Sequence, residues 1–371
     1  MPRNLSIGDY IGLEYETETL TPNQATTGLN NRVWRTDHDA SCESDAKNVG
    51  KLTVSSLPKS PTFQFSNTVI GTEIILSPPY CLETGTGQLL EELEKLTCML
   101  AESGEPAQNF RSGLHIHVSM PTSLRLLKTY VAMAANLEEV FFALGTQGYT
   151  FRGMLKNESA YCRPITQYGP PCVPVSSNSW AQVFDIESLL LAPNTTMFWN
   201  RYGNVDPNRD VNRYHPVRYT WFNLYALLAH GTLEFRNFNT TLNPYLIWAE
   251  VLFCKAFCEH CLSVGMSKDA KIMLPQNSVF NGRSKSEILR TFEDFASGLN
   301  LPSAVVNILG DTIQSAPEVC LPKSYIKSHL NRRDSTYDFS AHPNVRYFNN
   351  SEVKDVVVDD IHARRGERGP N

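Results

Sequence analysis

The chain has 371 residues, of which 42% are apolar and 19% are charged, as is ordinary for a folded, water-soluble protein. A formal net charge of −5, with clustered basic residues only at 362–368, argues against a nucleic-acid partner. No stretch reaches the roughly 20 apolar residues of a membrane span, and the first ten residues lack the apolar run of a signal peptide. The nine scattered cysteines are then expected to be reduced thiols in a cytoplasmic protein.

The first third of the chain is expected to form short strands joined by polar loops. Apolar and polar residues alternate over 11–16, as in a half-buried strand. Residues 17–66 are polar and irregular, and no element is expected there. A second strand is predicted at 69–76, ended by Ser77 and two prolines. Leucines at helical spacing then predict a helix over 87–102.

The middle of the chain begins with a predicted strand at 113–120 and a long helix at 124–144, which Gly145 ends. Residues 145–215 are dense in Gly, Pro, Asn and Tyr and are expected to be irregular. A loop of this length in a compact domain is either an insertion or a functional cover. We interpret the segment as a lid, with a plain surface insertion as the alternative.

The rest of the domain is expected to be mainly helical, with helices at 217–230, 244–264, 285–298 and 302–314 and one strand at 232–238. Residues 1–320 are expected to form one domain, followed by a polar extension at 321–371 that is partly disordered. Strands that alternate in polarity favour an antiparallel sheet with one open face, so the predicted fold class is α+β.

Each predicted strand has an apolar face and a face of chemically active residues. Residues i and i+2 of a strand share a face. The active faces carry carboxylates, imidazoles and one guanidinium, rather than the Lys, Thr and Ser of a solvated sheet face. Their members are Glu14, Glu16, Glu73, His115, His117, Glu234 and Arg236.

Four carboxylates gathered on one face would repel each other unless cations lay between them, so a site with two or more metal ions is predicted. Carboxylate-rich sites suit Mg²⁺ or Mn²⁺ rather than zinc. Because Mg²⁺ takes further ligands from phosphates, these residues indicate a nucleoside triphosphate and phosphoryl transfer. Arg236 could pair with a phosphate or with a substrate carboxylate. The alternative is a solvated face with no site.

Five motifs in order resemble the amidoligases of the carboxylate–amine ligase superfamily, which includes glutamine synthetase and glutamate–cysteine ligase. The resemblance covers about residues 8–260 and includes the segment Arg218-Tyr-Thr-Trp-Phe-Asn-Leu. The motifs are Gly12-x-Glu14-x-Glu16, Asp39-Ala40-Ser41, Glu73-Ile-Ile-Leu-Ser77-Pro78, Gly113-x-His115-x-His117 and Thr232-Leu-Glu234-Phe-Arg236.

The resemblance implies a sheet curved into a half-barrel, with helices on its convex face and ATP and metals in its concave face. His117 would lie near the ATP phosphates, and Arg236 would stabilise the transferred phosphoryl group. Asp39, Arg163, Ser41 and Asn223 stand at family-like positions: the first two are candidates for catalysis and the last two for ATP binding. The implied metal ligands are Glu14, Glu16, Glu73, His115 and Glu234, the last with a further catalytic role.

The implied reaction has two steps, an attack of a substrate carboxylate on the γ-phosphate of ATP and a displacement of phosphate from the resulting acyl-phosphate by an amine. The substrates would be small molecules or peptides. The resemblance leaves their identity open, and the sequence leaves open whether the chain forms a homo-oligomer.

Two other functions compete with the ligase. Cys254, Cys258 and Cys261 have the C-x₃-C-x₂-C spacing of radical enzymes that hold an iron–sulfur cluster. That spacing also lines one face of a helix, where buried cysteines pack as small apolar residues. The third alternative is a catalytically inactive nucleotide-binding module.

Overall fold

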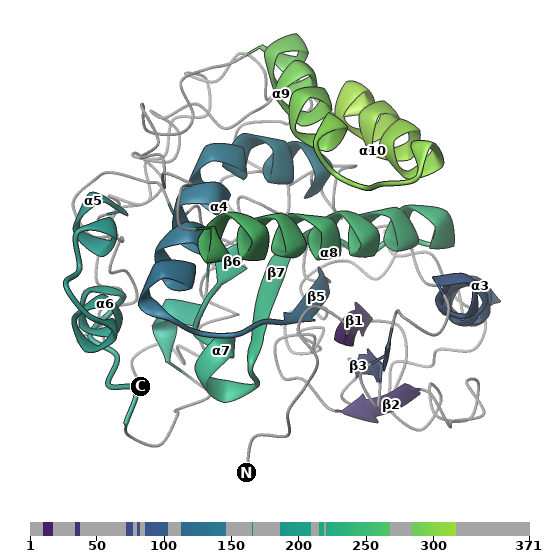
Figure 1. Ribbon diagram of the computed structural model, residues 1–371. Coiled ribbons are helices and arrows are strands. Elements are labelled where there is room, and N and C mark those ends of the chain that lie inside the picture. The colour runs from purple at the N-terminus through teal and green to yellow at the C-terminus, as the bar shows by residue number, and fades with distance from the viewer. Residues whose placement is uncertain are drawn as a thin grey trace, which may run out of the picture.

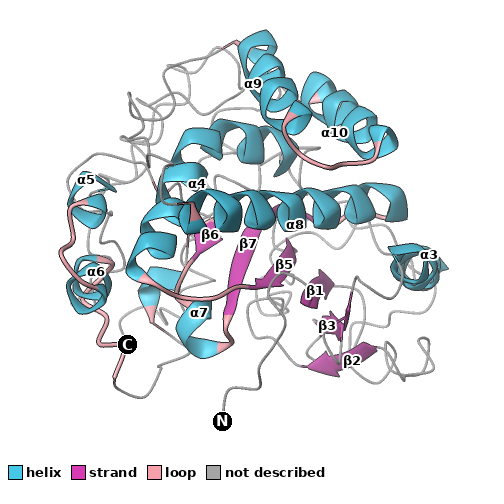
Figure 2. Cartoon of the chain, viewed as in Figure 1, coloured by secondary structure: helices cyan, strands magenta, loops and turns pink. Residues whose placement is uncertain are grey.

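The fold is described from a computed structural model (Figure 1), coloured by secondary structure in Figure 2. The structure describes these parts of the chain: 10–17, 34–37, 72–76, 80–81, 86–102, 113–145, 165, 186–208, 215–218, 220–267 and 284–316. The predicted C-terminal extension lies outside them.

The described strands form one antiparallel sheet in the order β2-β3-β1-β5-β7-β6, with the short β4 also paired to β1. The sheet is open, because β2 and β6 stand at its two ends. The strands are β1 (Tyr10–Thr17), β2 (Trp34–Asp37), β3 (Thr72–Leu76), β4 (Tyr80–Cys81), β5 (Gly113–Ser119), β6 (Phe222–Asn223) and β7 (Thr232–Asn239).

Helices cover one face of this sheet in two layers (Figure 1). The first layer is formed by α4 (Leu124–Gly145), which contacts β7, and α8 (Pro244–Met266), which contacts β5. Beside them, α3 (Thr86–Glu102) packs on α8. The second layer consists of α9 (Lys285–Ser297) and α10 (Ser303–Ser315). The predicted α+β class with an antiparallel sheet is therefore confirmed.

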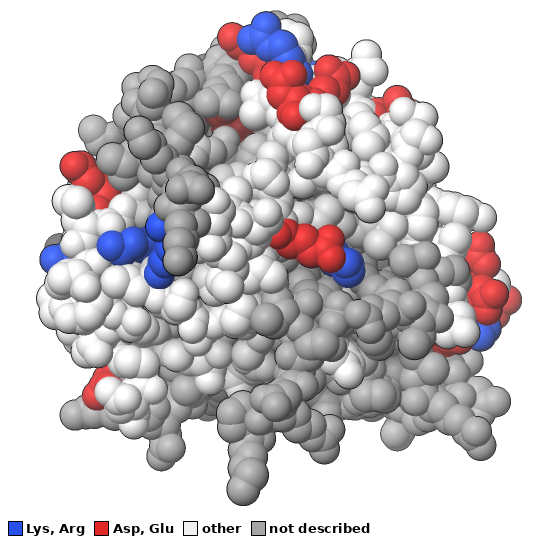
Figure 3. Space-filling model, in the orientation of Figure 1, with Lys and Arg blue, Asp and Glu red and all other residues white. Residues whose placement is uncertain are grey.

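Burial explains the composition of these helices. The central helix α8 touches the sheet and the helices α3, α4, α9 and α10, and it is apolar nearly all round, as a buried helix must be. The outer helix α9 is amphipathic and buries Ile288, Phe292 and Ala296 on one side. Figure 3 shows charged side chains over the outer surface of α9. Among the described residues, no helix combines the length and the apolar character needed to cross a membrane.

Local signals fix the helix starts. The side chain of Asn243 accepts hydrogen bonds from the backbone N–H groups of Tyr245 and Leu246, and Pro244 follows it at the first helical position of α8. Ser284 and Glu287 form a capping box at the start of α9. The expected boundaries of both helices are confirmed to within about two residues.

The core is organised around Phe141 of α4. Its ring lies 4.7 Å from that of Trp221, 5.4 Å from that of Phe235 and 5.3 Å from that of Phe257, measured between ring centroids. At the end of the same helix, a Cβ atom on Gly145 would lie 2.1 Å from the backbone oxygen of Asn237. Only glycine therefore allows α4 to approach β7 this closely.

Several expected elements were wrong. Residues 217–230 do not form one helix. They overlap a 3₁₀ turn (Pro216–Arg218) and include β6 and the short α7 (Ala226–Ala229). Phe222 and Asn223 pair with Phe235 and Glu234 of β7, so sheet pairing overrides helical propensity there.

Three further elements lie in segments that the sequence analysis treated as irregular. β2 falls within 17–66 and pairs with β3, which follows that segment. Two short helices fall within 145–215, namely α5 (Ile186–Leu190) and α6 (Thr195–Arg201). Asn194 caps α6 by accepting a hydrogen bond from the N–H of Met197 at 2.8 Å. These elements are short, and periodicity over so few residues gives little signal.

Candidate functional site

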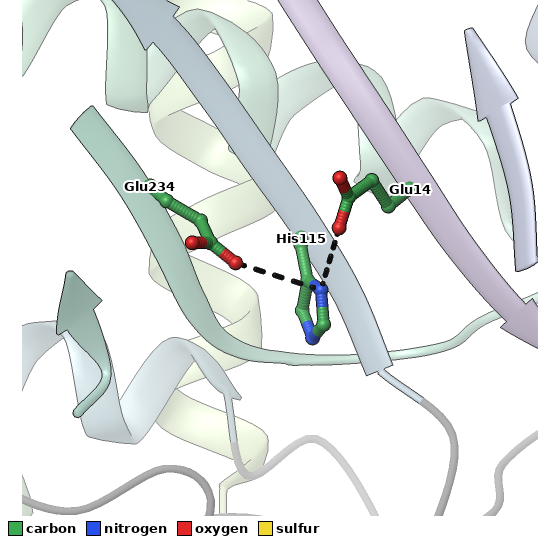
Figure 4. Close-up of side chains that lie close together, drawn as sticks. All are labelled: Glu14, His115 and Glu234. Atoms are coloured by element: carbon green, nitrogen blue, oxygen red, sulfur yellow. Dashed lines mark hydrogen bonds and ion pairs between the residues drawn. The ribbon is translucent and has the colours of Figure 1, made fainter. Parts of the chain in front are cut away.

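Three neighbouring strands bring Glu14, His115 and Glu234 together on the face of the sheet opposite the helices (Figure 4). His115 Nδ1 lies 3.1 Å from Glu14 Oε2 and 3.7 Å from Glu234 Oε1. One ligand atom of each residue lies within 4.8 Å of the others, close enough for one metal ion to touch all three. We refer to these three residues as the triad.

The faces of the strands explain how the triad forms. Ile11, Leu13 and Tyr15 of β1 are fully buried on the helix side, which turns Glu14 to the other side. In the cross-strand register, Glu14 lies opposite His115, as expected for side chains that meet across neighbouring strands. The predicted alternation of apolar and active faces is confirmed for β1.

His117 lies beside the triad, two residues from His115 along β5. Its Nε2 atom lies 3.3 Å from Glu14 Oε1 and 3.9 Å from Glu234 Oε1, and its Nδ1 atom lies 2.9 Å from the hydroxyl of Thr232. Gly12 lies directly opposite in β1, and a Cβ atom there would come within 3.3 Å of His117 Cβ. Glycine at this motif position therefore leaves room for the imidazole.

The carboxylate of Glu234 is held from two sides. Arg236 Nη1 donates to its Oε1 atom, and Asn223 Nδ2 donates to its Oε2 atom at 2.5 Å. Asn223 is itself fixed, because its Oδ1 atom accepts the N–H of Tyr225 at 2.9 Å. These contacts leave little rotational freedom to a side chain that is predicted to bind metal.

A bulge in β7 helps to place Arg236. The cross-strand register changes here, since Leu114 pairs with Phe238 and Ile116 pairs with Phe235, so two residues of β7 lie opposite His115. A bulge of this kind inserts one residue and redirects its neighbours. Arg236 consequently reaches Glu234 on the active face, and Phe238 returns to the aromatic core.

Glu16 and Glu73 extend the acidic surface beyond the triad. Glu16 Oε1 lies 3.5 Å from His115 Nε2, and its other carboxylate oxygen accepts the N–H of Gly113 at 2.6 Å. Glu73 of β3 lies opposite Glu16 in the register. All five predicted metal ligands therefore belong to four adjacent strands of one sheet.

The triad is poorly solvated, which strengthens every charge interaction within it. The side chains of His115 and Glu234 are 4% and 6% exposed, while Glu14 is 26% exposed and offers the route from solvent. Three carboxylates and one guanidinium meet in this space. Carboxylate oxygens with a single imidazole fit Mg²⁺ or Mn²⁺ rather than zinc.

The local charges also set the protonation states. Burial would raise the pKa of Glu14, but the charge of His117 and the hydrogen bonds from both imidazoles outweigh it, and the pKa lies well below its ordinary value. Burial likewise opposes ionisation of Glu234, but Arg236 and His117 lower its pKa to about 2. Burial would lower the pKa of His117, but Glu14 and Glu234 raise it. Glu14 and Glu234 are thus ionised at neutral pH, as metal ligands must be.

The remaining predicted site residues divide into two groups. Asn223 was expected near ATP, and the structure places it against Glu234. Asp39, Ser41 and Arg163 lie outside the described residues, so their roles stay predictions.

The three cysteines of the competing hypothesis lie inside α8 and are fully buried. Burial raises the pKa of each thiol well above its ordinary value. They pack in the core and are absent from the group of described residues that could hold a metal ion.

Sequence reasoning missed several residues that support the site. Thr232 lies on the same face as Glu234, and its motif position could have suggested its contact with His117. The hydroxyl of Tyr202 accepts the N–H of Leu224 at 3.0 Å, next to Asn223. The buried Glu138 accepts the indole N–H of Trp221 at 2.6 Å. The last two contacts join distant segments and leave no local signal.

Comparison with known proteins identifies the class. A family model described as "Putative amidoligase enzyme" matches residues 9–258, which is more than half of the chain. The chain therefore belongs to this amidoligase family, and the resemblance found in its motifs is confirmed.

The other two comparisons add little. A search of curated proteins finds no match. Among solved structures, the chain is similar to a bifunctional glutathione synthetase from Pasteurella multocida at 13% identity and a TM-score of 0.31, over 97% of this chain and 52% of that one. The chain thus spans about half the length of that protein, and so weak a likeness carries no argument.

Proposed function

We propose that the protein is an ATP- and Mg²⁺-dependent ligase that joins a carboxylate to an amine and releases ADP and phosphate. The observation that carries this proposal is the triad of Glu14, His115 and Glu234, with Arg236 paired to it, on a sheet of an amidoligase-family chain. Mn²⁺ could replace Mg²⁺ at such a ligand set.

The residues near the triad fit the handling of phosphate. Among the described residues, Arg236 Nε is a buried side-chain atom with no hydrogen-bond partner, and it lies beside the triad. Buried polar atoms without partners cost free energy, so a ligand that bonds them would gain affinity. An anionic phosphoryl oxygen would satisfy this group, and a guanidinium suits such oxygens especially.

The metal ligands would be Glu14, His115 and Glu234 for one ion, with Glu16 and Glu73 near a second. Bound there, Mg²⁺ or Mn²⁺ would neutralise the charge of the ATP phosphates. The two carboxylates at the second position lie opposite each other in the register, an arrangement that is unfavourable without a cation.

The protein side chains would act mainly by orientation and charge. Arg236 would stabilise the charge of the phosphoryl group as a substrate carboxylate attacks the γ-phosphorus and ADP leaves. The amine would then attack the acyl carbon, and phosphate would depart with the electrons of the broken C–O bond. Holding both substrates on one rigid sheet supplies proximity without a covalent protein intermediate.

We also interpret the open sheet as the half-barrel expected from glutamine synthetase-like ligases. Helices α4 and α8 cover one face, and the triad occupies the other, which agrees with a concave active face. Residues 145–215 would form part of the cover that keeps water from the acyl-phosphate, and residues 1–320 would form the ligase domain.

The test is ADP formation by the purified chain with ATP, Mg²⁺ and panels of carboxylates and amines. Wild-type protein should release ADP only when all components are present, and Glu234→Gln should reduce this rate at least about 10³-fold through loss of charge at the metal. Normal turnover in the Glu234→Gln variant would refute the site.

The same preparations separate the ligase from its competitors. Circular dichroism must show that the variant is folded, since Glu234 is hydrogen-bonded in the sheet. ATP binding without ADP formation over a broad panel would favour an inactive nucleotide-binding module. Bound iron and a brown colour would favour a cluster at the cysteines.

A further inference from the structure

Asn239 ends β7 with a buried amide that lacks any hydrogen-bond partner. The residue is 4% exposed, and neither its Nδ2 nor its Oδ1 atom is bonded. Among the described residues, it is the buried amide in which both polar ends are left unpartnered. Burial without partners costs free energy of folding, so such a group is expected to bond something that binds there.

Two nearby asparagines provide a contrast. Asn237 Nδ2 donates to the backbone oxygen of Phe141 at 2.7 Å and so joins β7 to α4. Asn223 is bonded at both ends, to Glu234 and to the N–H of Tyr225. Each of these two amides has at least one partner, although Asn237 Oδ1 is unbonded, whereas the side chain of Asn239 has none.

The position of Asn239 places its amide on the active face. Phe238 packs against Phe141 on the helix side, with the ring centroids 6.4 Å apart, and alternation along the strand turns Asn239 to the opposite side. Its cross-strand partner is Gly113, whose N–H donates to Glu16. Asn239 therefore lies on the same face as the triad, at the end of the sheet where Gly113 bonds Glu16.

Its distance from the triad is set by the register. Asn239 lies opposite Gly113, while Glu234 lies opposite His117, four residues further along β5. That separation from Glu234 corresponds to roughly 13 Å along the strand, while His115, two residues from Gly113, is roughly 7 Å away along it. Asn239 thus lies beyond the triad along the strands, within reach of a substrate that extends along the sheet.

We propose that Asn239 recognises an amide group of the substrate, either a peptide bond or a carboxamide. Its free N–H and C=O groups match a partner that offers one acceptor and one donor, as an amide does. A carboxylate would use only the donor end, and an ammonium group only the acceptor end. The substrate is therefore peptide-like or bears a carboxamide. This conclusion rests on the proposed function, in which the substrate lies along the active face of the sheet.

The test measures binding to the full chain in the presence of Mg²⁺ and ADP by isothermal titration. The probes are glycylglutamate, N-acetylglutamate and glycinamide, matched by the amide-free glutarate and ethanolamine. At least one amide probe should bind about tenfold more tightly than its match, and Asn239→Leu should remove this preference. Binding of glutarate and ethanolamine should change less than about twofold, because their contacts do not involve the amide.

The controls separate recognition from structure. Since the amide has no partner in the protein, Asn239→Leu should unfold at the same temperature as wild type or higher. Thr240→Val removes the fully buried, unpartnered hydroxyl of the next residue and should leave probe preference unchanged. A wild-type protein without preference for the amide probes, or an Asn239→Leu variant that keeps it, overturns this proposal. Amide preference without ADP formation instead refutes the proposed ligase and leaves this inference standing.

Discussion

The two faces of the central sheet are built on opposite principles. On the helix side, Phe235 and Phe238 of β7 pack against Phe141, and the contact surface is apolar. On the other side, the same strand presents Glu234 and Arg236, both buried and charged. Because side chains alternate along a strand, neighbouring residues of β7 serve the two faces in turn, except at the bulge between Phe235 and Phe238.

The difference shows where stability and function lie. Apolar burial stabilises the fold by about 25 cal/mol per Å² of surface. Buried charges cost free energy of folding, and pairing them with opposite charges can leave part of that cost uncompensated. Apolar packing on the helix face must therefore offset the cost of the charges buried on the active face. Substitutions on the helix face should mainly lower stability, and those on the active face should mainly lower metal binding or activity.

The largest expected effect is on the helix face, at Phe141. The substitution Phe141→Ala removes ring contacts to Trp221, Phe235 and Phe257 and leaves a cavity. It should lower the free energy of unfolding by about 3–5 kcal/mol, measured by denaturant titration. Met197 is 37% exposed, and Met197→Ala is the matched control, with an expected change below about 0.5 kcal/mol. Equal effects of the two substitutions would contradict the central position of Phe141.

The next largest effect is expected on the active face, where metal binding should stabilise the protein. Adding Mg²⁺ or Mn²⁺ to metal-free protein should stabilise it by about 2.7 kcal/mol at a concentration one hundred times the dissociation constant. The melting temperature with and without metal measures this gain.

Glu14→Gln tests whether the gain comes from the triad. The variant keeps the shape of the side chain but loses the charge of a ligand atom within 4.8 Å of the others. Its metal-induced rise in melting temperature should be largely lost, while Phe141→Ala should retain the rise on a less stable protein. A full rise in Glu14→Gln would mean that the metal binds elsewhere.

Whether a feature of the fold or the site could be predicted depends on how far apart in the sequence the interacting residues lie. The active faces of β1, β5 and β7 were predictable because apolar and polar residues alternate along each of these segments. This alternation assigned Glu14, His115 and Glu234 to the active faces of their strands. The order of the strands was not predictable, since the pairing of β1 with β5 joins residues about one hundred positions apart.

The missed features are those that depend on distant partners. β6 is two residues long and exists because it pairs with β7, and a helical interpretation of 217–230 fitted its residues equally well. The contact of Trp221 with Glu138 spans 83 positions in the sequence.

The smallest effect concerns Thr232, at the start of β7 on the active face. Thr232→Val keeps the size of the side chain but removes the hydroxyl that bonds His117 Nδ1 at 2.9 Å. The imidazole is buried, so losing this bond should cost about 1–3 kcal/mol of stability. A less firmly oriented imidazole should also slow ADP formation by about tenfold without changing metal affinity.

Thr312→Val is the matched control for this last substitution. Thr312 is buried in α10 and its hydroxyl donates to the backbone oxygen of Ile308 at 2.8 Å, so the same chemical group is removed far from the active face. This variant should lose some stability and keep the wild-type rate of ADP formation at saturating substrate. If both threonine variants slow the reaction equally, the effect follows from stability, and Thr232 does not orient His117. If only Thr232→Val slows it, the hydrogen bond acts on the reaction itself.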